Sequence, residues 1–152
     1  MPDQTPSFHS IAIAAHPQIS EGLQEAMKIS TLLKEHGFST QSGSLSDESL
    51  RKKVKQGEFD LFIALGGDGT MLRAGHLCGP LGIPILGINM GRFGFLMEIR
   101  QEQWEEALPQ LLKGDYWFEK RMMLRAEQWR TGERLGAWHV LNEIVVSRGH
   151  IV

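Results

Sequence analysis

The 152-residue sequence lacks several features that mark whole classes of protein. It has a single cysteine, Cys78, which excludes an internal disulfide and a cysteine-rich metal site and is compatible with a reducing cytosol. No apolar run reaches the ~18 residues of a membrane-spanning helix, and the first ten residues, MPDQTPSFHS, lack a signal-peptide pattern. We therefore expect a cytoplasmic protein with no membrane partner.

An excess of charge of either sign is also missing. The formal net charge is -2, from 16 basic and 18 acidic residues, so the composition gives no sign of the basic surface that nucleic acid requires. With 22% charged and 41% hydrophobic residues, the chain has the composition of an ordinary globular protein. We expect a folded chain with no nucleic-acid partner.

Short apolar segments alternate with amphipathic ones along the first 115 residues. Strands are predicted at residues 10–15, 38–41, 60–65 and 83–88, and helices at residues 20–36, 70–77 and 101–113. Residues 60–65 are almost continuously apolar, as in a central parallel strand covered on both faces. Residues 42–57 are polar and predict a loop and a short exposed helix without core residues. This alternation predicts an α/β fold, with a mostly parallel sheet flanked by helices.

After residue 115 the pattern changes to longer strands. These are predicted at residues 116–129 and 137–147, on either side of a turn at Thr131, Gly132 and Glu133. We therefore predict an α/β domain at residues 1–115 and the start of a β-rich domain at residues 116–152. The sequence ends in or just after an apolar strand, from which we expect it to be cut from a longer protein; a short natural domain is the alternative.

The most informative segment is GGDGT, residues 66–70, which directly follows the predicted central strand. The glycines allow a sharp turn and a close approach to an anionic group, and the amides that open the next helix would add donors. This predicts a phosphate-binding loop. A carboxylate at Asp68 repels phosphates unless it binds a metal ion or accepts a proton; the alternative is a structural helix cap. The glycine spacing fits neither a Rossmann fingerprint nor a Walker A loop.

GGDGT after a hydrophobic strand resembles the signature shared by NAD kinases, diacylglycerol and sphingosine kinases, and 6-phosphofructokinases. Two further segments resemble NAD kinases in particular: GINMGRFGFL at residues 87–96 and LNE at residues 141–143. All three occur in the order and at the spacing of that family, so the resemblance covers about residues 8 to 150. It implies a 6-phosphofructokinase-like α/β nucleotide-binding domain followed by a β-rich NAD-binding domain.

The resemblance also implies a role for each matching residue. Asp68 would be the general base that takes the proton from the 2′-hydroxyl of the adenosine ribose of NAD, which then attacks the γ-phosphate of ATP. Phe95 would lie beside the adenine, with plain core as the alternative. Asn142 and Glu143 would hold adenine and ribose groups, with a structural hydrogen bond as the alternative. The nucleotide-binding set implied is Gly66, Gly67, Asp68, Gly69, Thr70, Arg73, Phe95, Asn142 and Glu143.

The implied substrates are ATP and NAD, and the implied product is NADP. Mg²⁺ would offset the phosphate charge, and no residue is assigned as a metal ligand. A homo-oligomer, dimer or tetramer, is implied for the full-length protein, and little activity is expected from the isolated 152-residue chain. Two alternatives are a lipid kinase of the same superfamily and a non-catalytic nucleotide-binding module. The sequence leaves open whether ATP or polyphosphate is the donor and whether NADH is accepted.

The remaining candidate residues are assigned structural roles. Asn89 and Gly91 are expected to form a turn, and Cys78 to be a small buried hydrophobe. Three histidines have no metal-like spacing, so surface or packing roles are favoured over ligation: His16, His76 and His139.

Overall fold

The computed structural model describes residues 8–92, 94–141 and 143–146. The chain divides into two compact units, Met1–Phe118 and Glu119–Val152, which are considered separately. The first unit is built on a parallel sheet with the strand order β2-β1-β3-β4-β5. Its strands are β1 (Ser10–Ala15), β2 (Ser39–Ser44), β3 (Leu61–Gly66), β4 (Ile85–Asn89) and β5 (Ile99–Arg100).

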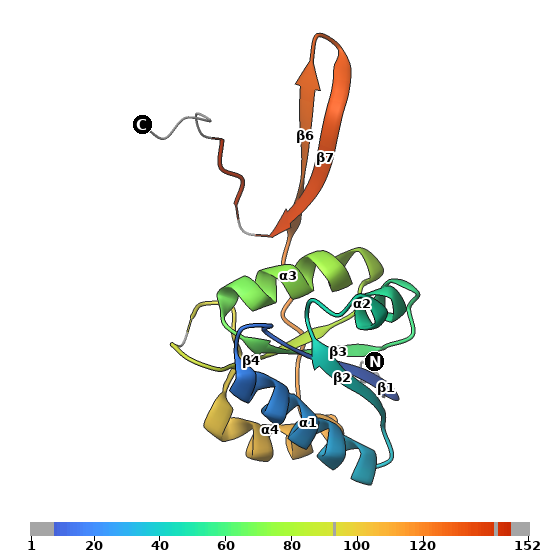
Figure 1. Cartoon of the computed structure of the whole chain (residues 1–152), viewed down its shortest axis with the longest axis vertical. Coiled ribbons are helices and arrows are strands. Elements are labelled where there is room, and N and C mark those ends of the chain that lie inside the picture. Colours follow the sequence, from blue (N-terminus) through green and yellow to red (C-terminus); the bar gives the residue numbers. More distant parts are fainter. Residues whose placement is uncertain (1–7, 93, 142, 147–152) are drawn as a thin grey trace. The chain divides into compact units, whose positions relative to one another are not determined.

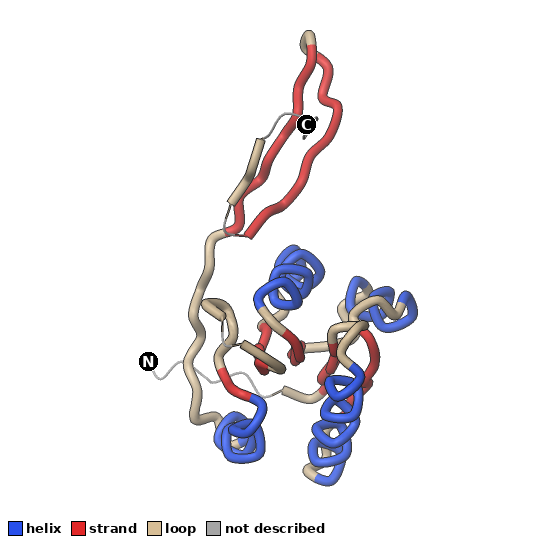
Figure 2. The backbone as a smooth tube through the Cα atoms, turned by 60° about the vertical axis from the view of Figure 1, so that its left-hand side comes forward, coloured by secondary structure: helices blue, strands red, loops and turns tan. Residues whose placement is uncertain are grey.

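Helices cover both faces of this sheet (Figures 1 and 2). They are α1 (Ser20–Glu35), α2 (Glu48–Lys55), α3 (Asp68–Cys78) and α4 (Trp104–Leu112), with short 3-10 turns at Gly79–Leu81 and Gln101–Gln103. Gly37, just beyond α1, has a φ of 88°, a left-handed conformation that favours glycine at the end of a helix. The predicted α/β fold with a parallel sheet between helices is confirmed.

Alternate residues of the central strands enter two separate cores. Ile63 of β3 packs with residues of α1 and α4, whereas Phe62, its neighbour, packs with residues of α2 and α3. Both side chains are fully buried. Strand side chains alternate between faces, so a strand covered on both sides must be apolar at every position. The continuously apolar sequence of β3 follows directly from this placement.

The prediction that residues 42–57 contribute no core was wrong. β2 continues to Ser44, and Leu45, Leu50 and Val54 are 2%, 1% and 0% exposed. A short helix does form in this segment, and the Asp47 side chain caps it by accepting hydrogen bonds from the backbone N–H groups of Ser49 and Leu50. A few apolar residues are enough to form core contacts here, because Leu50 and Val54 are four positions apart and lie on one face of the short helix α2.

A buried polar contact joins α1 to α4, which cover the same face of the sheet. The Glu25 carboxylate accepts a hydrogen bond from Trp104 Nε1 at 3.0 Å and lies 2.6 Å from Lys28 Nζ. Glu25 is 9% exposed and Trp104 is 5% exposed. A carboxylate buried this deeply is stable only when it is paired and hydrogen-bonded, and both conditions hold here.

The second unit is a β-hairpin of β6 (Met123–Arg130) and β7 (Glu133–Leu141). Thr131 and Gly132 form its two-residue turn, with φ of 46° and 85°. The predicted bounds were wrong: residues 116–122 are not strand, and β7 begins at residue 133. In a two-residue turn with positive φ at both positions, the residues on either side pair directly with each other. Arg130 therefore pairs with Glu133, and β7 begins there.

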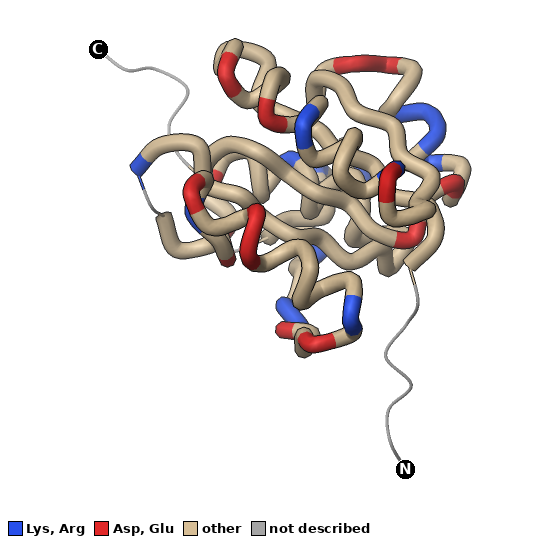
Figure 3. Tube along the Cα trace, turned by 90° about the horizontal axis from the view of Figure 1, so that it is seen from below, with Lys and Arg blue, Asp and Glu red and all other residues tan. Residues whose placement is uncertain are grey.

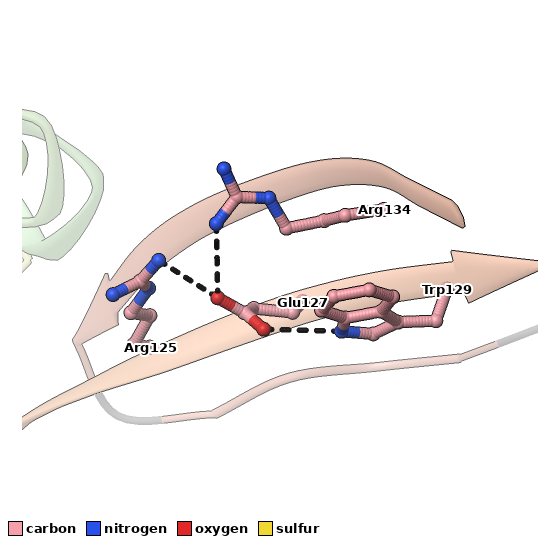
Figure 4. Close-up of polar contacts among 4 residues, drawn as sticks. All are labelled: Arg125, Glu127, Trp129 and Arg134. Atoms are coloured by element: carbon pink, nitrogen blue, oxygen red, sulfur yellow. Dashed lines mark hydrogen bonds and ion pairs between the residues drawn. The ribbon is translucent and has the colours of Figure 1, made fainter. Parts of the chain in front are cut away.

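Charged residues of both signs are interspersed along the described chain (Figure 3). One group lies on the hairpin, where Glu127 contacts Arg125 at 2.7 Å and Arg134 at 3.5 Å and accepts a hydrogen bond from Trp129 Nε1 (Figure 4). Within the described residues, no helix combines the length and the apolar character needed to cross a membrane.

Candidate functional site

The GGDGT segment lies where β3 ends and α3 begins, at the carboxyl edge of the sheet. The neighbouring strand β1 leads into α1, which packs on the opposite face from α3. Where adjacent parallel strands send their helices to opposite faces, a crevice opens between the two loops, and ligands of α/β folds bind in this place. An open hollow of about 400 Å³ lies here, lined by His16, Gln18, Ile19, Gly67, Gly69 and Thr70.

Asp68 stands in the first turn of α3 and reaches across to a second predicted motif. Its Oδ2 accepts the backbone N–H of Phe95 and its Oδ1 accepts that of Leu96, both at 3.0 Å. The N-cap residue of α3 is Gly67, so the alternative in which Asp68 caps the helix is wrong. A carboxylate has about four acceptor positions, so two remain for a further donor.

The segment around Phe95 is held from both sides. Leu96 and Met97, each 5% exposed, pack with Met71 of α3 in a small third core. A Cβ atom at Gly94 would collide with the Asp68 carboxylate, so a glycine is required for this close approach. Phe95 itself is 96% exposed, which rules out the alternative that it is a core residue. The backbone is therefore fixed while the aromatic ring faces solvent.

The glycines of the loop are needed for a reason other than the predicted sharp turn. Gly67 has φ -122° and ψ -168°, an extended conformation that any residue can adopt. Gly66 is required because a Cβ there would strike the Thr70 side chain, whereas nothing lies within 4 Å of a Cβ built on Gly67 or Gly69. These two glycines instead leave the floor of the hollow open to a bulky group.

The start of α3 leaves hydrogen-bond donors without a partner in the part of the chain that the structure describes. The backbone N–H groups of Thr70 and Met71 are the first of α3 to bond within the helix, both to the Gly67 carbonyl, so the preceding amides at the start of the helix have no partner inside it. Thr70 is 1% exposed, and its Oγ1 has no hydrogen-bond partner among the described residues. Unpaired donors at a helix N-terminus are suited to an anion.

Three predicted site residues remain, Arg73 in the first unit and Asn142 and Glu143 in the second. Arg73 is exposed on α3, and five residues of helix turn it about 140° away from Asp68. Glu143 is exposed and belongs to the second unit, where it follows β7 rather than lying in a strand as expected. Asn142 lies outside the described residues.

Two structural predictions made from the sequence are confirmed. Asn89 Nδ2 donates to the Gly91 carbonyl at 2.6 Å, which closes the expected turn after β4. Cys78 is fully buried in the core between the sheet and α3, and burial raises the pKa of its thiol to about 12. Neither residue lines the hollow beside Asp68.

Sequence reasoning missed His16, which was assigned a surface or packing role. The structure places it in the hollow, at the carboxyl end of β1, and its backbone N–H donates to the Leu65 carbonyl of β3 at 2.9 Å. A usable signal was present in the sequence: His16 directly follows a buried strand, as GGDGT does. The carboxyl ends of neighbouring parallel strands meet at one edge of the sheet.

Residues 7–116 match the ATP-NAD kinase N-terminal domain family. The NAD kinase of Chloroflexus aggregans is 36% identical to this chain over 141 residues, which cover 93% of this chain and 51% of that protein. The NAD kinase of Heliobacterium modesticaldum is 43% identical over 100 residues, covering 66% of this chain and 35% of its own length. The chain spans about half the length of the Chloroflexus relative that it matches.

Solved structures show the same fold. Yeast NADH kinase complexed with NADH superimposes with a TM-score of 0.64 at 14% identity, covering 91% of this chain and 50% of its own. The NAD kinase of Archaeoglobus fulgidus in complex with ATP gives a TM-score of 0.56 at 24% identity, with 82% and 45% covered. At these sequence identities, the superpositions show a shared fold and nothing further.

Proposed function

Since the chain belongs to the ATP-NAD kinase family, we propose that it carries the catalytic part of a site that phosphorylates NAD. The phosphate of a donor would pass to the 2′-hydroxyl of the adenosine ribose, forming NADP. The observation that carries the proposal is the pair of hydrogen bonds between Asp68 and the backbone of Phe95 and Leu96. Asp68 and Phe95, which are 27 residues apart in sequence, are thereby joined through the Phe95 backbone, and each is suited to a different part of NAD.

Asp68 is proposed as the general base. Its carboxylate takes the proton from the 2′-hydroxyl, the ribose oxygen attacks the γ-phosphorus of ATP, and the bond to the β-phosphate breaks to release ADP. The two backbone N–H groups fix the carboxylate in orientation and leave it lone pairs for the hydroxyl. Little covalent chemistry is needed in phosphoryl transfer, so orientation of this kind is the main contribution a protein makes.

The hollow is proposed as the site of the donor phosphates. The opening amides of α3 and the unpaired Thr70 hydroxyl supply donors, and Gly67 and Gly69 supply space. The solved Archaeoglobus relative holds ATP, which supports ATP as donor; polyphosphate remains the alternative. Among the described residues, no three histidine, cysteine or acidic groups are clustered as metal ligands. A divalent ion such as Mg²⁺ fits this site as a companion of the phosphates, whose charge it would offset.

The acceptor side of the site is assigned to the second motif and to the second unit. The exposed Phe95 ring is proposed to contact the adenine, with Arg73, Asn142 and Glu143 adding contacts to NAD. Residues 116–152 are proposed to begin a β-rich NAD-binding domain, after the α/β domain at residues 1–115. The yeast relative was solved with NADH, which supports a nicotinamide dinucleotide as acceptor. We propose a homo-oligomer, acting in the cytoplasm.

A chimera tests this proposal. In it, the chain replaces the matching half of the Chloroflexus aggregans NAD kinase, whose unaltered form serves as the positive control. We expect the chimera to consume ATP when NAD is added and to form NADP. A folded chimera that phosphorylates a diacylglycerol instead, or that binds NAD without turnover, would contradict the proposal in favour of a lipid kinase or a non-catalytic module. The isolated 152-residue chain is expected to show little turnover.

The role of Asp68 needs a second comparison, because Asp68→Asn also replaces one acceptor oxygen that the loop uses. Gly94→Ala disturbs the same contact between the loop and Asp68 but retains the carboxylate group. If Asp68 is the base, Asp68→Asn in the chimera should lower kcat by about 10²–10⁴-fold more than Gly94→Ala does. Equal losses in the two variants would mean that Asp68 serves only to hold the loop.

A further inference from the structure

A hydrogen bond to the imidazole of His16, a residue that lines the hollow, selects one tautomer of the neutral ring. The backbone N–H of Gln18 donates to His16 Nδ1 at 3.2 Å. A backbone N–H can only donate, so Nδ1 must be the unprotonated nitrogen of the ring. In a neutral imidazole the proton then resides on Nε2, which becomes a hydrogen-bond donor.

The position of this ring is fixed by the sheet. His16 directly follows β1, and its backbone N–H is bonded to the Leu65 carbonyl of β3. His16 lines the same hollow as Gly67, Gly69 and Thr70, although about fifty residues separate it from them in sequence. His16 therefore stands opposite the GGDGT loop at the point where β1 and β3 end.

A polyphosphate placed in this hollow would need more donors than the loop supplies. Neither lysine nor arginine is among the six residues that line the hollow. The donors on the α3 side are the opening amides and the buried Thr70 hydroxyl, which lacks a partner among the described residues. A phosphate chain presents oxygens in several directions, so a donor at the end of β1 would bind oxygens that the start of α3 does not reach.

We propose that His16 binds the phosphate chain of the donor through Nε2–H and so helps to position it. This rests on the proposed function, which puts the donor phosphates in the hollow. The role is the recognition of phosphate, shared by ATP and inorganic polyphosphate. Metal ligation is a poorer fit, because no carboxylate or thiol is among the residues that line the hollow with His16.

Two substitutions separate the ring's donor from its acceptor. His16→Asn keeps an acceptor for the Gln18 N–H but has nothing in the place of Nε2, whereas His16→Gln can place an amide N–H there. Inorganic tripolyphosphate and ATP are titrated by calorimetry into the 152-residue chain and both variants, with circular dichroism to check folding. A hydrogen bond to a charged group predicts that His16→Asn binds both probes about ten-fold more weakly, and His16→Gln within about three-fold of the unaltered chain.

A second readout is independent of substitution. Long-range ¹H–¹⁵N spectra report which imidazole nitrogen carries the proton. We expect the Nε2–H form for His16 and a shift of its Nε2 resonance on addition of tripolyphosphate, with no shift for His36, which lies at the far end of α1. An Nδ1–H form, or an unmoved Nε2 signal under saturating probe, would overturn the inference.

The outcomes distinguish this inference from the proposed function. If the unaltered chain binds tripolyphosphate and His16→Asn binds it equally well, the role of His16 is wrong while the phosphate-binding hollow stands. If the unaltered chain binds neither probe, the hollow is not a phosphate site and both ideas fail. If tripolyphosphate binding depends on His16 but the chimera does not phosphorylate NAD, the inference stands and the acceptor assignment fails.

Discussion

The Oδ2 atom of Asp68 accepts the backbone N–H of Phe95 at 3.0 Å, and this bond links the start of α3 to the loop that follows β4. The neighbouring oxygen is bonded in the same way to Leu96. Because both oxygens are bonded to the loop, the carboxylate and the loop hold each other in position. Phe95, whose ring is exposed to solvent at 96%, is thereby held through its backbone at the carboxylate proposed to act on the same dinucleotide.

The first prediction concerns Gly94, whose missing side chain permits this contact. Gly94→Ala should displace the loop from Asp68, because a Cβ there collides with the carboxylate. We expect a loss of about 1–3 kcal/mol in the free energy of unfolding. The amides of Phe95 and Leu96 should also exchange faster with solvent hydrogen. Gly91→Ala is the matched control, since nothing lies within 4 Å of a Cβ at that position. Equal amide exchange in the two variants would contradict the expected contact.

The second prediction separates the two glycines that precede Asp68. Gly66→Ala should lower the free energy of unfolding by about 1–3 kcal/mol, because its Cβ would strike Thr70. Gly67→Ala should change it by less than about 0.5 kcal/mol, since its backbone is extended and the added methyl meets no atom. Urea unfolding of both variants measures the difference. Any loss of tripolyphosphate binding in Gly67→Ala then reports on the hollow and not on folding.

A third prediction tests the contact between α1 and α4. Trp104→Phe removes the Nε1 donor and leaves a buried Glu25 oxygen without it. We expect this variant to lose about 1–2 kcal/mol of unfolding free energy. Trp117→Phe makes the same chemical change at a ring that is 88% exposed and should have almost no effect. A comparable loss in both would mean that the Glu25 contact adds nothing to stability.

The fourth prediction follows from the buried thiol. Burial raises the pKa of Cys78 from its ordinary value of 9.0 to about 12. In that range the unfolded chain loses the thiol proton while the folded chain keeps it, so stability falls as pH rises. Between about pH 8 and pH 10, the unaltered chain should lose roughly 1 kcal/mol more than Cys78→Ala, because other titrating groups are common to both. Parallel pH profiles for the two would indicate an accessible thiol.

Local sequence was sufficient for the layered fold because burial on two faces requires unbroken apolar strands such as β3. It was insufficient for β2 and α2, where Leu45, Leu50 and Val54 supply core contacts from within a polar segment. The hydrophobic signal there was too sparse to distinguish a covering helix from a solvated one. Contacts with the rest of the sheet, which no local window contains, decided the outcome.

The candidate site, like the fold, could be predicted only in part from the sequence. GGDGT could be identified from its residue types and the motif that contains Phe95 from its resemblance to a known family, and Asp68 could be identified as the residue requiring a chemical explanation. The cause of the glycine requirement could not, since Gly66 and Gly94 are set by contacts with Thr70 and Asp68. The buried strand before His16 indicated a position at the end of a strand, but its place in the hollow also depends on β1 and β3 being neighbours.

By itself, the sequence determined the layered α/β pattern of the first unit and singled out Asp68 as a residue requiring a chemical explanation, because periodicity and composition act over a few neighbouring positions. Only the tertiary structure decided that Asp68 would hold the backbone of Phe95 and that His16 would line the same hollow as the glycine loop. Both relationships join segments far apart along the chain, and the parallel strand order that brings them to one edge of the sheet is a property of the packed molecule.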